Sequence, residues 1–127
     1  MPPVITKAIN ALENAQAAVS ANPKSADAHA GLGWAYYGKG QLAEALKSLQ
    51  EVLALDPEHL EAHYGLGLVH KGMGSKMEAV AEFQRAAALA EKIEDNNRNL
   101  MLARIIRGHI NQINLGDWSL GKHEKHV

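Results

Sequence analysis

The feature that most constrains this chain is an internal repeat, in which residues 26–59 recur 34 positions later as residues 60–93. The identical pairs include His29 and His63, Gly31 and Gly65, Leu32 and Leu66, Gly33 and Gly67, Gly40 and Gly74, Glu44 and Glu78, and Ala45 and Ala79. A period of 34 residues matches one helix–turn–helix unit, and such units bury their apolar faces by stacking on one another. The repeat therefore predicts an all-α fold built from antiparallel helix pairs.

Each unit contains two predicted helices separated by a glycine. Apolar and small residues at three- and four-residue spacing place the helices of the first unit at 26–39 and 42–55. Gly40 ends the first helix, since glycine adopts the left-handed conformation at low cost. Gly33 is small where the second helix must cross closely, and Pro57 stops that helix. Further helices are expected at 4–21, 60–73, 76–93 and 97–114, and the expected core residues are Leu32, Leu49, Leu66 and Phe83.

The two units resemble tetratricopeptide repeats. The matching residues are Leu32, Gly33, Tyr36, Ala45, Leu49 and Pro57 in the first unit, and Leu66, Gly67, Ala79, Phe83 and Ala86 in the second. Both units carry histidine, at His29 and His63, where the family usually has tryptophan, and His70 replaces the usual tyrosine. The resemblance implies a short right-handed α-solenoid whose concave face binds peptides or protein segments.

One helical repeat domain is expected over residues 1–114. It would comprise a half repeat at 4–25, full repeats at 26–59 and 60–93, and a C-terminal capping helix at 97–114, because repeat arrays need terminal elements that shield the last apolar face. Residues 115–127 are largely polar and are expected to form a flexible C-terminal tail.

The composition argues against several classes of protein. There is no cysteine, so disulfides and thiolate metal sites are excluded. The 13 Lys and Arg residues nearly balance the 14 Asp and Glu residues, so no charge excess points to nucleic acid or to a membrane surface. No apolar run is long enough to span a bilayer, and the N-terminus does not have the pattern of a signal peptide. A cytoplasmic location is therefore expected.

No catalytic, cofactor-binding or metal-binding residues are predicted. The tripeptide at 31–33 lies within a helix, and Tyr36 stands where a dinucleotide site would need its third glycine. His59 and His63 are one helical turn apart, but a pair of histidines is weak evidence for a metal, and packed histidines in place of core aromatics are favoured. No serine has a histidine and a carboxylate in an arguable geometry. The protein is therefore not expected to be an enzyme.

The resemblance assigns a peptide groove to the first helix of each unit. Its positions are Asp27, Ala30, Trp34 and Tyr37, followed by Glu61, Tyr64, Leu68 and Lys71. In the chaperone-binding subgroup a Lys and an Asn grip a carboxylate, but Ala30 and Trp34 stand at those positions here. The lining is aromatic instead, with residue types that commonly anchor protein or peptide partners. The alternative is that Trp34 belongs partly to the core and Tyr64 merely covers it.

The last predicted helix carries two apolar sets. The first suits docking on the preceding helix pair and consists of Leu100, Ala103, Ile106, Ile110 and Ile113. The second set, which needs a separate cover, consists of Met101, Leu102 and Ile105. That cover is either a second copy in a homodimer or the tail that contains Trp118 and Leu120. Two functions therefore stay open: an adaptor that binds a peptide or helix of another protein, and a self-assembling structural module without a peptide ligand.

Overall fold

The computed structural model describes residues 3–93 and 97–116, and within these ranges it contains six helices and no strand. The helices are α1 (Pro3–Ala21), α2 (Ala26–Gly38), α3 (Leu42–Leu55), α4 (Leu60–Gly72), α5 (Lys76–Lys92) and α6 (Asn97–Leu115). Every helix expected from the sequence is present, with ends that differ by at most one residue. Most of the predicted tail, residues 117–127, lies outside the described residues.

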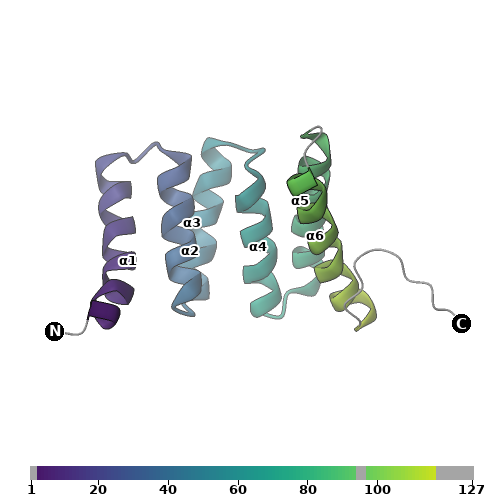
Figure 1. The fold of residues 1–127 in the computed structure, drawn as a ribbon, viewed down its shortest axis with the longest axis horizontal. Coiled ribbons are helices and arrows are strands. Elements are labelled where there is room, and N and C mark those ends of the chain that lie inside the picture. Colours follow the sequence, from purple (N-terminus) through teal and green to yellow (C-terminus); the bar gives the residue numbers. More distant parts are fainter. Residues whose placement is uncertain (1–2, 94–96, 117–127) are drawn as a thin grey trace, which may run out of the picture.

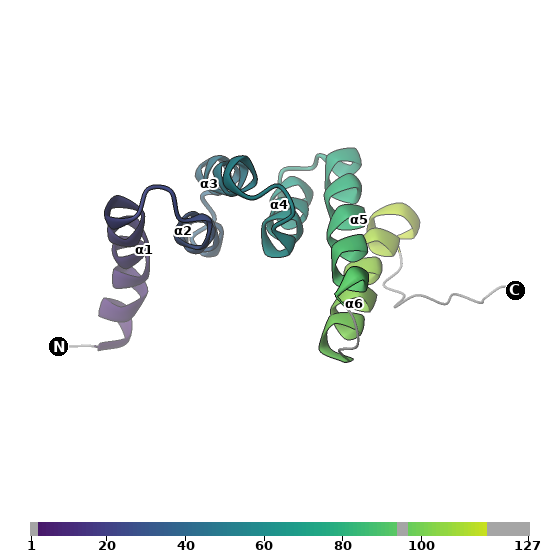
Figure 2. The ribbon, with the colours of Figure 1, turned by 90° about the horizontal axis from the view of Figure 1, so that it is seen from above.

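The helices form an all-α solenoid in which neighbours along the chain pack on one another. Figure 1 shows them side by side in one row, with α1 at one end and α5 and α6 at the other. Figure 2 shows that the row bends, with α2 and α4 on the inner side of the bend and α3 on the outer side. Besides these successive contacts, α2 packs directly against α4. The first helices of the two units therefore share one continuous surface.

The turn inside each unit is set by a glycine in the left-handed conformation. Gly40 has φ 77° and Gly74 has φ 83°. In the first unit the backbone N–H of Gln41 donates to the carbonyl oxygen of Tyr36, and that of Gly40 donates to Tyr37, both at 3.0 Å. This is the hydrogen-bond pattern of a glycine-capped helix end, and it confirms the predicted role of Gly40.

A second pair of glycines allows the two helices of each unit to cross closely. A Cβ atom on Gly33 would lie 2.8 Å from the side chain of Leu49, and one on Gly67 would lie 2.5 Å from the ring of Phe83. Both distances are below normal van der Waals contact. Gly31 differs, because a Cβ there would meet nothing within 4 Å. The prediction that Gly33 is small for reasons of packing is confirmed.

The interior consists of two clusters rich in alanine. The first contains Ala30, Ala45, Leu49, Val52, Ala62, Leu66 and Val69. The second contains Ala79, Phe83, Ala86, Ala87 and Ile106. Leu49, Leu66 and Phe83 are buried as predicted, but Leu32 is only partly buried. The reason lies in its position, because α2 has only the single helix α1 on its N-terminal side, whereas α4 packs on both helices of the preceding unit, α2 and α3.

The docking face of α6 differs from the predicted one at two residues. Leu100 is 52 % exposed, whereas Leu102 is partly buried and packs against the second cluster. Each residue turns an α-helix by about 100°, so Leu102 lies about 40° around the helix from the buried Ile106, and Leu100 lies about 120° away. The stripe therefore runs through Leu102, Ile106, Ile110 and Ile113, flanked by the buried Ala103.

Candidate functional site

The predicted groove positions lie on α2 and α4, and all but one of them are exposed or partly buried. Ala30 is only 5 % exposed and belongs to the first core cluster, so it does not line a surface. The exposed positions are Asp27 and Glu61, and the partly buried ones are Trp34, Tyr37, Tyr64, Leu68 and Lys71.

Aromatic rings form a continuous row across α2, α4 and the helices behind them. The ring centroids of Trp34 and Tyr37 are 6.0 Å apart in an edge-to-face arrangement, and those of Trp34 and Tyr64 are 6.3 Å apart. Tyr64 continues the row to the buried Phe83, at 5.9 Å. Trp34 also lies close to the backbone of Gly65, since a Cβ there would be 3.3 Å from the indole ring. The indole thus has one side against the protein and part of its surface in solvent, and the groove and core interpretations both stay open.

His109 of α6 joins this row and was not anticipated from the sequence. Its ring stacks on Phe83 with centroids 5.0 Å apart and an interplanar angle of 14°, and it lies 5.7 Å from the ring of Tyr64. The sequence gives one indication that His109 faces the other helices, which is its position three residues after Ile106 and therefore near the docking stripe of α6. The contact joins residues 45 positions apart, which no local pattern indicates.

Hydrogen bonds determine which nitrogen of His109 carries the proton. The ammonium of Lys71 can only donate, so Nδ1 of His109, at 3.3 Å, is the acceptor. Nε2 then carries the hydrogen and donates to the hydroxyl of Tyr64, also at 3.3 Å. Burial, and secondly the charge of Lys71, lower the pKa of His109 to about 4. Burial, and secondly Tyr37, raise the pKa of Tyr64. Lys71 also bonds to Gln112, so α4 and α6 are joined by polar as well as apolar contacts.

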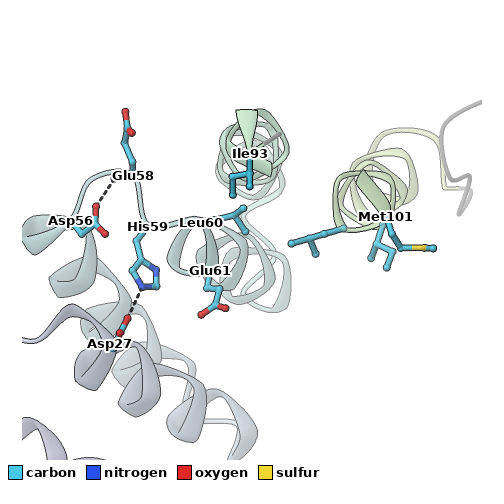
Figure 3. A pocket seen from close by; sticks show the side chains of 10 residues that line it. Asp27, Asp56, Glu58, His59, Leu60, Glu61, Ile93 and Met101 are labelled. Atoms are coloured by element: carbon cyan, nitrogen blue, oxygen red, sulfur yellow. Dashed lines mark hydrogen bonds and ion pairs between the residues drawn. The ribbon is translucent and has the colours of Figure 1, made fainter. Parts of the chain in front are cut away.

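A pocket of about 870 Å³ opens where α4 and α6 begin (Figure 3). We call it the acidic–apolar pocket, after the residues that line it: Asp27, Asp56, Glu58, His59, Leu60, Glu61, Ile93, Met101, Leu102 and Ile105. It combines Asp27 and Glu61, which were predicted for the peptide groove, with the three residues predicted for an oligomer interface. Two members of the predicted groove set and all three of the predicted interface set therefore line one pocket, which could not be read from their separation in the sequence.

Two side chains on the polar side of this pocket are held by hydrogen bonds. Nδ1 of His59 accepts from the backbone N–H of Ala62 at 3.2 Å, which caps the start of α4. Its Nε2 therefore carries the hydrogen and donates to the carboxylate of Asp27 at 3.3 Å. The carboxylate of Asp56 accepts the backbone N–H of Glu58 at 3.2 Å. The contacts of His59 with Asp27 and of Asp56 with Glu58 are drawn in Figure 3.

The histidines that replace the family's tryptophan serve as polar links. Nε2 of His29 lies 2.7 Å from the carbonyl oxygen of Pro23, and Nε2 of His63 lies 2.9 Å from that of Pro57. His63 is 4 % exposed, as predicted for a packed residue, and its Nδ1 is 2.6 Å from the carboxylate of Glu82. These contacts tie each turn between units to the helix that follows it.

Residues 3–93 and 97–116 form neither a metal-binding cluster nor a helix suited to a membrane. In that part of the chain no three His, Cys, Asp or Glu side chains gather closely enough to hold a metal ion. Within the same ranges, no helix combines the length and the apolar character needed to cross a membrane.

Comparisons with known proteins agree with the repeat structure. Family models described as TPR repeat and tetratricopeptide repeat match residues 33–74, 6–47 and 60–93, which together extend from residue 6 to residue 93. The crystal structure of MamA protein is similar in fold, with a TM-score of 0.63 at 24 % identity over 84 % of this chain. The match spans 58 % of the MamA chain, so this chain corresponds to only part of it. No curated protein matches the sequence.

Proposed function

Because this chain belongs to the tetratricopeptide repeat family, whose members hold other proteins, we propose that it is an adaptor that binds a peptide or helix of a partner on the inner surface of α2 and α4. The observation that carries the proposal is the row formed by Trp34, Tyr37 and Tyr64, which is only partly buried although Tyr37 and Tyr64 also pack on the core clusters. Large aromatic side chains with a polar atom are the residues that most often dominate binding energy at interfaces. We assign no catalytic step and no cofactor to this surface.

The test is to compare partner binding by the unaltered chain and by Trp34→Ala. Truncating a central aromatic anchor costs about 2 kcal/mol or more of binding energy, which is roughly a thirtyfold loss of affinity. Proteins captured from the native source by the unaltered chain would be identified by mass spectrometry, and the affinity of each would then be measured by calorimetry. Met77→Ala is a suitable control, because Met77 is 85 % exposed and lies on α5 outside this surface. A Trp34→Ala variant that binds normally but unfolds at lower temperature would identify Trp34 as a core residue.

The alternative function is a self-assembling structural module. Two observations favour it: Leu100 and Met101, at the start of α6, are 52 % and 57 % exposed, and Leu102 and Ile105 line the adjacent pocket. In this alternative Met101, Leu102 and Ile105 pack against a second copy of the chain. The two proposals differ in the expected mass of the free protein, which is that of one chain for the adaptor and of at least two for the self-assembling module.

A further inference from the structure

We infer that the acidic–apolar pocket determines which partner is bound. It binds a segment in which a lysine or arginine is next to a bulky aliphatic or aromatic residue. The inference rests on the proposed function, because the pocket adjoins the surface of α2 and α4 and shares Asp27 and Glu61 with it. It adds the class of partner, which neither the repeat motif nor the aromatic row specifies.

The first argument is the charge of the pocket. Four of its ten lining residues are Asp or Glu, and none is Lys or Arg. The contacts of Asp27 and Asp56 do not cancel this charge, because their donors are a neutral imidazole, as deduced from the hydrogen bonds of His59, and a backbone amide. The carboxylates of Glu58 and Glu61 have no partner among the described residues. Like charges gathered around a concave surface produce a potential that attracts a cation.

Helix termini explain only part of this arrangement. Asp27 and Glu61 stand in the first turns of α2 and α4, where the helix dipole stabilises an acidic side chain. That effect does not require Glu58, which precedes α4. It also does not require the apolar residues on the other side of the pocket. The pocket therefore contains more than well-placed helix ends.

The second argument is the apolar side, to which three helices or helix ends contribute. Ile93 follows α5 and is 48 % exposed, Met101 is 57 % exposed, and Leu60, Leu102 and Ile105 are partly buried. In Figure 3, Met101 on α6 lies across the opening from His59, with Glu61 between them. An aliphatic or aromatic side chain docked here would remove these residues from water, while a neighbouring cation would reach the carboxylates. Acidic partners are disfavoured by the same four charges.

A second copy of the chain fits this pocket poorly. In a two-fold contact the same patch meets itself, so the four carboxylates of one copy would face the four of the other. Like charges placed opposite one another across an interface oppose binding. We therefore assign the pocket to a segment of a different protein.

The experiment is a selection of random displayed peptides on the immobilised full-length chain, followed by affinity measurements on synthetic copies of the enriched peptides. We expect enrichment of sequences with lysine or arginine beside leucine, isoleucine or phenylalanine. Glu58→Lys combined with Glu61→Lys should weaken these peptides at least about tenfold, and raising the salt concentration should weaken their binding to the unaltered chain. Glu44→Lys combined with Glu51→Lys is the matched control, because both residues are exposed on α3 and neither lines the pocket.

A second pair of variants tests the apolar side without altering charge. Met101→Ser should weaken the same peptides several-fold, whereas Leu115→Ser, at a residue 59 % exposed and outside the pocket, should not. Circular dichroism of each variant confirms that the helices are retained.

The outcomes separate this inference from the proposed function. Enriched peptides that are neutral or acidic, or that bind the doubly substituted pocket with unchanged affinity, overturn the inference; if Trp34→Ala still abolishes their binding, the proposed function stands. A selection on the unaltered chain that enriches no peptide overturns both. A synthetic peptide of residues 117–127 that displaces the selected peptides, or an unaltered chain that is dimeric and becomes monomeric on Met101→Ser, would assign the pocket to this chain itself and overturn the inference.

Discussion

At the scale of single residues, Gly31 of the first unit and Gly67 of the second have different roles. Gly67→Ala should destabilise the protein by about 1–3 kcal/mol, because its Cβ would lie 2.5 Å from the ring of Phe83. Gly31→Ala should instead stabilise it by up to about 1 kcal/mol, because alanine favours a helix and the site is open. Urea denaturation followed by circular dichroism measures both changes. Equal effects at the two positions would contradict the packing role assigned to Gly67.

His109 predicts how stability depends on pH. Its pKa in the folded chain is about 4, below the ordinary value of 6.5, so between these values the unfolded chain binds a proton that the folded chain does not. The neutral, buried His109 therefore contributes its full share to the free energy of unfolding above about pH 6.5. This contribution is lost as the pH falls toward 4. Thermal melting at several pH values should show this decrease, and it should be smaller in His109→Gln, which cannot titrate. An identical pH dependence in the two proteins would exclude this role for His109.

At the scale of the helices, α6 is held by the stripe centred on Ile106. Ile106→Ala should cost about 2–5 kcal/mol, because Ile106 is fully buried against the second core cluster. Leu100→Ala should change stability by no more than about 0.5 kcal/mol, because that side chain is largely exposed. Denaturation gives both free energies, and hydrogen exchange would show whether Ile106→Ala loosens α6 specifically. A larger loss at Leu100 than at Ile106 would restore the docking stripe expected from the sequence.

The helices themselves were largely predictable, and the faces they present were less so. Helix ends depend on residues a few positions away, such as Gly40 and Pro57, so the pattern located them to within one residue. Which face of α6 is buried depends on how the helix is rotated about its own axis where it packs on α5. A helix with apolar residues on several sides does not specify that rotation. For this reason Leu100, which was expected in the docking stripe, is exposed, and Leu102, which was expected outside it, packs against the second cluster.

At the scale of the whole molecule, the adaptor and self-assembly proposals predict different masses. We expect the free chain to sediment as a monomer, because a two-fold contact through the acidic–apolar pocket would bring like charges together. Analytical ultracentrifugation over a wide concentration range measures this. A dimer that Leu102→Glu with Ile105→Glu returns to a monomer would favour the self-assembly alternative. The double variant could also dissociate because it unfolds, since Leu102 packs on the second core cluster. Met101→Glu tests the same interface without disturbing the core, because Met101 is 57 % exposed.

The sequence by itself determined the repeat, the six helices, the glycine turns and most of the core. These features follow from a 34-residue period and from interactions between residues close together in the chain. Only the tertiary structure decided that His109 stacks on Phe83 and bonds to Tyr64, 45 positions away. It also brought Asp27 and Glu61 into one pocket with Met101. Such contacts depend on how successive helix pairs are rotated against each other, and small differences in side-chain packing, which no local pattern records, determine that rotation.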